Sequence, residues 1–288
     1  MKQERKAQAN KPSWIRILLS LLVLPAVLLE QGIAQLAGQL LRQVGLPADL
    51  CVHAAALCCG LMVWLTVRLL CGQILGLMPA DCRMAAPRFR ALWCVVAFAL
   101  PGFVCIALIN LPGYWQINFL STDELGAVLF SALFYQGLTA GIVQEAVFRG
   151  MLLSAFERGI NRLAGILLNS ALFSVVQLIG QQLTVAQAVQ LLVFYMLLGL
   201  LFSLVTVETG NIWNAALMHS VWGAAISGGV LHIGTSANPA ALANYLLADS
   251  GDLLTGGSAG AAASVLAIVA CTVFVALAFW RCHMKKLI

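Results

Sequence analysis

Residues 91–112 form the stretch ALWCVVAFALPGFVCIALINLP, which holds no charged side chain. A helix needs roughly 20 mostly apolar residues to cross a bilayer, so this segment alone is long enough for one span. Working outward from it, seven further apolar stretches can be marked: 14–36, 50–72, 124–147, 163–182, 187–206, 210–232 and 259–280. The pattern predicts an all-α protein, a polytopic membrane helical bundle of about eight transmembrane helices.

The composition supports this fold class and excludes several others. Hydrophobic residues make up 61% of the 288 positions and charged residues 9%. A typical soluble domain has about 45–50% apolar and 25% charged residues. The chain has too little polar surface to cover a soluble globule, which excludes disorder, a fibrous repeat and nearly every cytosolic enzyme fold. We expect a single transmembrane domain at 14–280, with short basic tails at 1–13 and 281–288.

Neither a nucleic acid nor a metal is expected to bind. The net charge is +5, but the basic residues lie between the apolar runs and not along one face. The nine cysteines lie mostly inside or beside apolar segments and form no CxxC pair. The sequence therefore indicates no zinc site, no disulfide framework and no cofactor, and membrane lipid is the first expected partner.

The positions of Lys and Arg predict the orientation in the membrane, because cytoplasmic loops carry an excess of these residues. With eight spans, one side of the membrane receives nearly all of them: Lys2, Arg5, Lys6, Lys11, Arg16, Arg83, Arg88, Arg90, Arg149, Arg158, Arg162, Arg281, Lys285 and Lys286. The opposite side receives mainly acids, with a single basic residue: Asp49, Asp123, Glu124, Asp249, Asp252 and Arg42. We therefore expect both termini in the cytoplasm and a multi-pass protein of a bacterial-type plasma membrane.

The loops on the acidic side carry no catalytic motif. Residues 113–123 hold aromatic side chains suited to the membrane interface. Residues 233–258 are rich in Gly, Ala, Ser and Asn, and we expect them to form a long, mobile loop.

Polar groups inside the apolar segments point to a common pocket. Glu145 and Arg149 lie four residues apart and share one helix face. His219 and Gln177 lie within two later segments, and Gln144 precedes Glu145. Such groups need partners in hydrocarbon. We expect a pocket that opens to the cytoplasmic leaflet, although polar groups that only hold helices together would give the same pattern.

Residues 139–223 resemble the core of the CPBP family of intramembrane proteases, which includes the type II CAAX prenyl endopeptidase and bacteriocin-processing homologues. The family shows Glu-Glu-x-x-x-Arg, then Phe-x-x-x-His, then His-x-x-x-Asn or a similar residue, each on its own helix. The corresponding segments here are QEAVFR at 144–149, FSVVQ at 173–177 and HSVWG at 219–223. The resemblance implies a protease-like helical core at about 124–232, with its site at these motifs.

The chain departs from the family at the residues that carry the chemistry. The resemblance implies that positions 144 and 177 hold and activate a water molecule, and that positions 219 and 223 stabilise the oxyanion. Gln144 and Gln177 carry amides, which are not basic near neutral pH. Gly223 offers no side-chain donor, and loss of one such donor raises a barrier by roughly 3–4 kcal/mol.

Three functions remain open. In the first, the chain binds a membrane-anchored or lipidated polypeptide segment and has weakened or lost proteolysis. In the second, it is an active endopeptidase that uses Glu145 and His219 as catalytic residues, next to Arg149. In the third, it is a small transporter. Metal catalysis is not expected, because it needs three converging ligands and only Glu145 and His219 are candidates.

Overall fold

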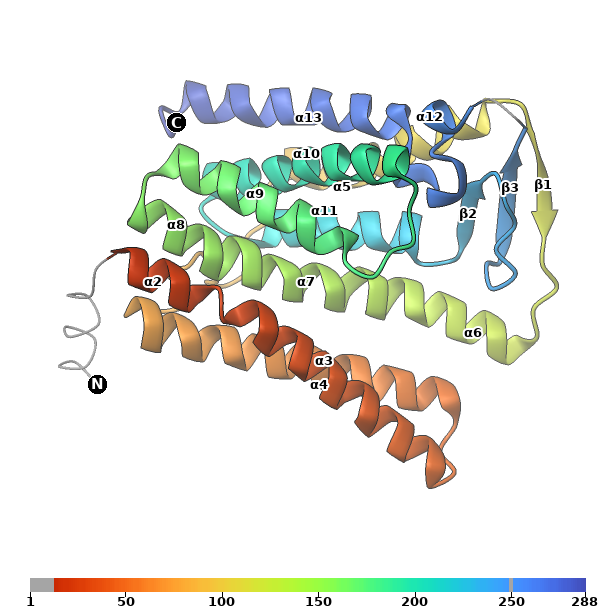
Figure 1. Ribbon diagram of the computed structural model, residues 1–288, viewed down its shortest axis with the longest axis horizontal. Coiled ribbons are helices and arrows are strands. Elements are labelled where there is room, and N and C mark those ends of the chain that lie inside the picture. Colours follow the sequence, from red (N-terminus) through yellow and green to blue (C-terminus); the bar gives the residue numbers. More distant parts are fainter. Residues whose placement is uncertain (1–12, 249–250) are drawn as a thin grey trace.

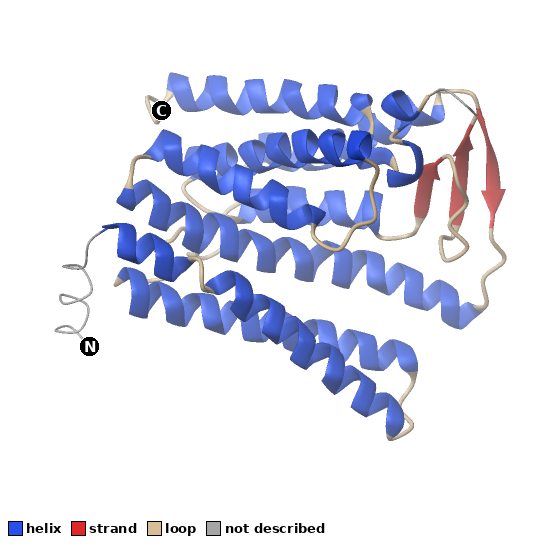
Figure 2. Cartoon of the chain, in the orientation of Figure 1, coloured by secondary structure: helices blue, strands red, loops and turns tan. Residues whose placement is uncertain are grey.

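The computed structural model of the chain describes residues 13–248 and 251–288. The basic tail expected at 1–13 therefore lies almost wholly outside the described residues, and so does Asp249. The long helices run along the long axis of the molecule (Figure 1), with α2 and the C-terminal end of α13 at one end and a small sheet at the other (Figure 2).

A helix is present at each of the eight apolar segments. The helices are α2 Ser13–Ser20, α3 Val23–Gln43, α4 Ala48–Leu70, α5 Ala91–Ile109, α6 Thr122–Phe130, α7 Ala140–Glu145, α8 Leu153–Gly159, α9 Arg162–Leu178, α10 Val185–Thr209, α11 Trp213–Trp222, α12 Asp252–Thr255 and α13 Val265–Met284. Several are extended by π-helical turns: η1 Cys71–Leu75, η2 Ser131–Thr139, η3 Ala146–Leu152 and η4 Gly223–Ser227. Two short 3₁₀ segments, η5 Gly257–Ala259 and η6 Ala261–Ala263, precede α13.

Six helical runs are long and apolar enough to cross a membrane: Ser13–Gln43, Leu50–Leu75, Ala91–Ile109, Thr122–Gly159, Val185–Thr209 and Val265–Met284. Helix α9 is apolar but has only 17 residues, and α11 has 10 before it continues as η4. The first run bends between α2 and α3, because Pro25 has no N–H to donate to the preceding turn. The structure thus shows a mostly helical chain with six candidate membrane-spanning helices.

The run from Thr122 to Gly159 is one continuous helix that includes η2 and η3. It extends past residue 147, where the apolar pattern predicted its end, because apolar side chains continue through Phe156 and are buried there. Glu145 therefore lies well inside a long helix and not near its C-terminal end. The expectation that the pocket opens to the cytoplasmic leaflet assumed that this helix ends near residue 147.

The start of this run has a complete capping box. Ser121 Oγ accepts a hydrogen bond from the backbone N–H of Glu124, and the Glu124 carboxylate accepts one from the backbone N–H of Ser121. Such a cap satisfies backbone donors that have no partner within the helix.

Replacing Ser121 with Ala is expected to lower the free energy of unfolding by about 1 kcal/mol, because α6 loses this cap. The measurement is the thermal unfolding of the protein in detergent. Ser131→Ala, in the π-helical continuation of the same run, is the matched control and should change little. Equal midpoints for the two variants would contradict the assignment of Ser121 as the cap.

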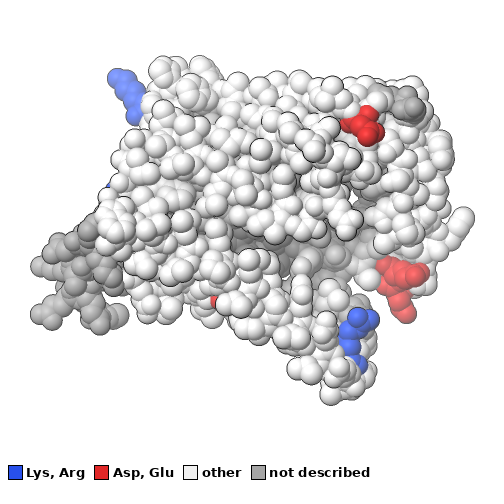
Figure 3. Space-filling view, viewed as in Figure 1, with Lys and Arg blue, Asp and Glu red and all other residues white. Residues whose placement is uncertain are grey.

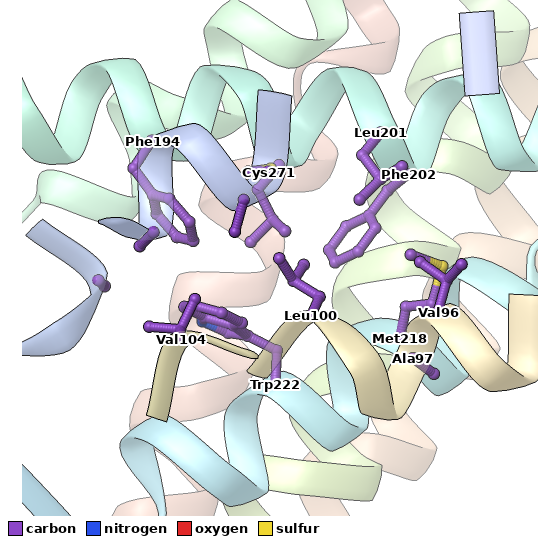
Figure 4. Packing of buried hydrophobic residues seen from close by; sticks show 14 of the residues in the cluster. Val96, Ala97, Leu100, Val104, Phe194, Leu201, Phe202, Met218, Trp222 and Cys271 are labelled. Atoms are coloured by element: carbon purple, nitrogen blue, oxygen red, sulfur yellow. The ribbon is translucent and has the colours of Figure 1, made fainter. Parts of the chain in front are cut away.

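The main hydrophobic core joins α5, α10, α11 and α13. Figure 4 shows side chains from these helices meeting in one layer. Its members include Leu100 and Val104 from α5, Phe202 from α10, Trp222 from α11 and Cys271 from α13, all nearly or fully buried. The third sequence motif begins on α11, which is part of this core, and α9, which carries the second motif, packs against α10.

A buried carboxylate on α10 ties this helix to α5 and α13 at the end where α13 terminates. Glu208 Oε2 accepts a hydrogen bond from Trp93 Nε1 at 2.9 Å. Its Oε1 accepts from Arg281 Nη2 at 2.9 Å and lies 2.7 Å from Lys285 Nζ. Arg90 Nη1 lies 3.3 Å from the same oxygen. The cations that surround Glu208 come from two distant parts of the chain, the start of α5 and the C-terminal end of α13.

The loops at the opposite end form a sheet, which corrects the sequence-based expectation there. Strand β1 Gly113–Ile117 pairs antiparallel with β3 Ala243–Leu247, and β3 pairs parallel with β2 Leu231–Gly234. The described part of 233–258 thus contains strand and short helical segments beside turns, and the chain is not purely α-helical. The central strand β3 holds Tyr245, Leu246 and Leu247 side chains that are buried, which favours pairing on both of its edges.

Candidate functional site

The centre of the site is a buried ion pair on the long helix. Glu145 ends α7 and Arg149 lies one turn later in η3. Arg149 Nη1 donates to Glu145 Oε1 at 2.9 Å, and both side chains are fully buried. Arg149 Nη2 also donates to the backbone oxygen of Gly199 on α10, at 3.2 Å. The pair therefore links the first motif to α10 as well as neutralising its own charge.

Aromatic rings enclose the guanidinium of Arg149. Its central carbon lies 4.4 Å from the ring centre of Phe173, 5.2 Å from Phe202 and 5.7 Å from Phe148. Attraction between a cation and an aromatic face is strong when water is absent. The Phe of the second motif thus packs on the Arg of the first motif.

His219 joins this group from α11. Its Nδ1 lies 2.8 Å from Glu145 Oε1, the same oxygen that Arg149 binds. Its ring stacks on Phe202, with centroids 5.2 Å apart, and meets Phe173 edge-on at 5.8 Å. Because the carboxylate accepts from Nδ1–H, the second ring nitrogen, Nε2, is left with no hydrogen-bond partner in the described part of the chain.

A cavity of about 180 Å³ lies against His219. Its walls are Gln136, Ala140, Gln144, Gln177, Gln181, Tyr195, Leu198, His219, Trp222, Gly223 and Ser227. All four sequence positions that correspond to the family's catalytic set are therefore at one cavity. Glu145 does not line it: its carboxylate lies behind His219, and its Oε2 is buried without a hydrogen bond among the described residues.

The polar lining of this cavity consists mainly of amides. Gln136, Gln144, Gln177 and Gln181 all contribute to it. The side-chain oxygen of Gln144 is buried and accepts no hydrogen bond from any residue that the structure describes. A buried acceptor without a partner can accept a hydrogen bond from a bound molecule.

Gly223 allows two helices to touch. A Cβ atom at this position would overlap the backbone oxygen of Gln136 in η2. Gly141, one turn before Glu145, is packed in the same way against the backbone N–H of Ser220, which would lie 2.8 Å from an added Cβ. Position 223 thus lacks an oxyanion donor, and the space for one is occupied by the neighbouring helix.

The cavity extends towards the sheet end of the molecule. Gln181 follows the end of α9, and Ser227 ends η4, which leads into β2. The other end of α9 begins at Arg162, whose Nη1 donates to the backbone oxygen of Leu287 near the C-terminus. The cavity therefore lies towards the sheet end of the molecule and away from the chain's C-terminal end.

Two of the cavity amides were not singled out from the sequence. Gln136 precedes Gln144 by two helical turns on the same long helix, so it continues a face that already carries a motif residue. Gln181 lies just after the end of α9, where helical spacing gives no such signal. Tyr195 was missed as well, because an aromatic residue within an apolar run carries no signal of its own. Within the described residues, no group of three or more His, Cys, Asp or Glu side chains could hold a metal ion.

Comparison with known proteins finds a match in the part of the chain that contains the three motifs. Residues 126–225 match the family model described as type II CAAX prenyl endopeptidase Rce1-like. The match contains every motif residue at the cavity and confirms the family resemblance inferred from the sequence. Searches of curated proteins and of solved structures found no match.

Proposed function

We propose that this chain, whose residues 126–225 belong to the Rce1-like type II CAAX prenyl endopeptidase family, binds a membrane-anchored or lipidated polypeptide segment, and that its proteolytic activity is lost or strongly reduced. One observation carries the proposal: the cavity presents amides at positions 144 and 177, while the nearest carboxylate, Glu145, is bound by Arg149 and His219 behind the cavity wall.

The chemistry of this lining suits binding better than hydrolysis. A general base must accept a proton from water, and a Gln amide does not do so near neutral pH. The same amide offers both N–H donors and a carbonyl acceptor. A peptide group inside a membrane needs both kinds of partner, because no bulk water is present to supply them. Gln144 and Gln177 can therefore pair with an exposed peptide bond that they do not cleave.

We further propose that the chain crosses a bacterial-type plasma membrane eight times, with α9 and α11 as short crossings and both termini in the cytoplasm. The charge distribution supports this arrangement. Arg83, Arg90, Arg158 and Arg162 lie in or beside the turns at the end where α13 terminates, and the sheet lies at the other end. In Figure 3 most of the charged groups on the visible face lie near the two ends of the long axis, with a mostly uncharged band between them.

The proposal is tested by a cleavage assay in proteoliposomes that contain membrane-anchored peptides. The native chain is compared with a Gln144→Glu, Gln177→His double variant, in which the two water-activating groups of the family are restored. The double variant is expected to cleave about 10²–10⁴ times faster than the native chain, the usual contribution of general acid–base catalysis. Position 223 is left unchanged, since a side chain there would overlap the backbone of η2.

Gln181→His is the matched control, because it places an imidazole in the same cavity at a position outside the family motifs. It should leave cleavage at the native level. Binding is measured in parallel by photo-crosslinking of the same peptides to the native chain. A native chain that cleaves as fast as the double variant contradicts the loss of proteolysis, and a chain that neither binds nor cleaves any peptide favours the transporter alternative.

The 2.8 Å contact between Glu145 and His219 supports a second candidate, an active endopeptidase with a rearranged site. In this scheme His219 Nε2 takes a proton from a water molecule, and the resulting hydroxide adds to the peptide carbonyl carbon. Glu145 stabilises the imidazolium, and the proton passes to the leaving amine as the C–N bond breaks. Native cleavage that His219→Gln abolishes and Gln144→Ala leaves intact would establish this candidate over the first.

A further inference from the structure

A second cavity lies at the end of the molecule where α8 and α9 meet the segment 76–90. Its volume is about 350 Å³, and it shares no residue with the cavity at His219. It is lined by Asp81, Arg83, Ser154, Glu157, Arg158 and Arg162. All of these groups are polar, so the cavity is built for a charged or hydrogen-bonding molecule and not for an acyl chain.

Arg83 is held in an unusual conformation at the wall of this cavity. Its φ is +60°, the left-handed region that residues other than glycine rarely adopt. Its backbone oxygen accepts a hydrogen bond from Ile212 N at 3.1 Å, which fixes the conformation. Its side-chain Nη2 donates to Glu157 Oε2 at 2.6 Å. Strained residues that are fixed by their surroundings are frequent at binding sites.

Two hydrogen-bond donors at this cavity have no acceptor. Arg83 Nη1 is buried, and no residue in 13–248 or 251–288 accepts its hydrogens. The Ser154 side chain is 3% exposed, and its hydroxyl likewise has no hydrogen-bond partner in those ranges, although it lies near the weakly accepting sulfur of Cys82. Unsatisfied buried donors are costly, and a ligand with several acceptor oxygens would satisfy both.

The two acids at the cavity are already engaged. Asp81 Oδ2 accepts from the backbone N–H of Met78 at 3.0 Å. Glu157 Oε2 accepts from Arg83, and its Oε1 lies 3.6 Å from Arg162 Nε, with no hydrogen bond among the described residues. Arg158 is exposed and has no ion pair in the part of the chain that the structure describes. The cavity therefore keeps an excess of positive charge, in the form of guanidinium groups whose planar donors match phosphate oxygens.

The position of the cavity indicates where the anion comes from. The cavity lies where the long helix ends, at Gly159, and where α9 begins, at Arg162. The C-terminal segment is close by, because Arg162 donates to the backbone oxygen of Leu287. The ends of membrane-spanning helices lie at the level of the lipid headgroups. We propose that this cavity binds a phosphate group, and that the headgroup of an anionic phospholipid supplies it. The inference does not depend on whether the site at His219 cleaves its ligand.

The test measures thermal unfolding of the full chain in neutral detergent. Phosphatidylglycerol or phosphatidylcholine is added in one arm, and sodium phosphate or sodium chloride at equal ionic strength in the other. A ligand that binds the folded state raises the unfolding midpoint in proportion to its affinity. Phosphatidylglycerol is expected to raise the midpoint of the native chain. Arg158→Gln and Ser154→Ala should each weaken its apparent affinity by at least about tenfold, because each removes one hydrogen bond to a charged group.

Arg88→Gln is the matched control, since it removes one positive charge from the same loop as Arg83 but does not line the cavity. It should retain the native affinity, as should Arg42→Gln on α3. A rise that sodium phosphate produces and Arg158→Gln abolishes, without an effect of phosphatidylglycerol, would support the phosphate site and replace lipid by a soluble source. The proposal is overturned if neither ligand acts, or if Arg158→Gln and Arg88→Gln behave alike.

Discussion

Replacing Glu145 with Ala is expected to lower the free energy of unfolding by about 3–5 kcal/mol, the usual cost of leaving one partner of a buried ion pair alone. Arg149 is fully buried, and without Glu145 its charge would face only the backbone oxygen of Gly199 and aromatic rings. His219 would lose the carboxylate that holds its Nδ1. The change in the free energy of unfolding is measured by reversible unfolding in mixed micelles, monitored by tryptophan fluorescence.

Two companion variants separate charge from shape at this position. Glu145→Gln keeps an acceptor for Arg149 but not the charge, so its loss should be intermediate. Adding Arg149→Met to Glu145→Ala removes the isolated cation and should recover part of the stability, because apolar residues of similar size can replace a buried pair. If Glu145→Ala unfolds at the same denaturant concentration as the native chain, the ion pair does not support the fold.

Introducing Asn at position 223 is expected to cost about 3 kcal/mol, although Asn is the residue that the family favours there. The added Cβ would overlap the backbone oxygen of Gln136, so η2 and η4 would have to separate. Overpacking a close helix contact typically costs about 1–3 kcal/mol, and a clash with backbone lies at the upper end because no side chain can rotate away. Gly223→Ala, with a smaller side chain at the same place, should show most of the same loss.

Gly102→Ala provides the control. Gly102 lies inside α5, where an added Cβ would meet no atom within 4 Å. Alanine is favoured over glycine in a helix by about 1 kcal/mol, so this variant should be as stable as the native chain or more stable. Comparable unfolding of Gly223→Ala and Gly102→Ala would show that the two helices do not touch at position 223.

Much of the helical framework was predictable from local sequence. Each of the apolar segments contains a helix, and six helical runs are long and apolar enough to cross a membrane. The motifs at 144–149, 173–177 and 219–223 identified the family, and the matched family model covers all of them. One residue of the first motif, one of the second and two of the third line a single cavity, namely Gln144, Gln177, His219 and Gly223.

Other features depend on residues far apart in the chain. The pairing of β1 with β3 joins segments that are more than 120 residues apart in the chain, and no local pattern marks such a partner. The long helix passes residue 147 because the side chains beyond it find a buried environment against other helices. Glu208 was not recognised from the sequence, since its partners Trp93, Arg281 and Lys285 are distant from it along the chain.

The sequence by itself determined where helices form and which motif positions carry amides, because apolar length and side-chain chemistry are local properties. It also determined that positions 144 and 177 hold amides where the family holds an acid and an imidazole. Only the tertiary structure decided that Glu145 points to Arg149 and His219 and not into the cavity, and that Gly223 is closed off by η2. The direction of a side chain and the space beside a glycine depend on how distant helices pack, and that information is not contained in any single segment.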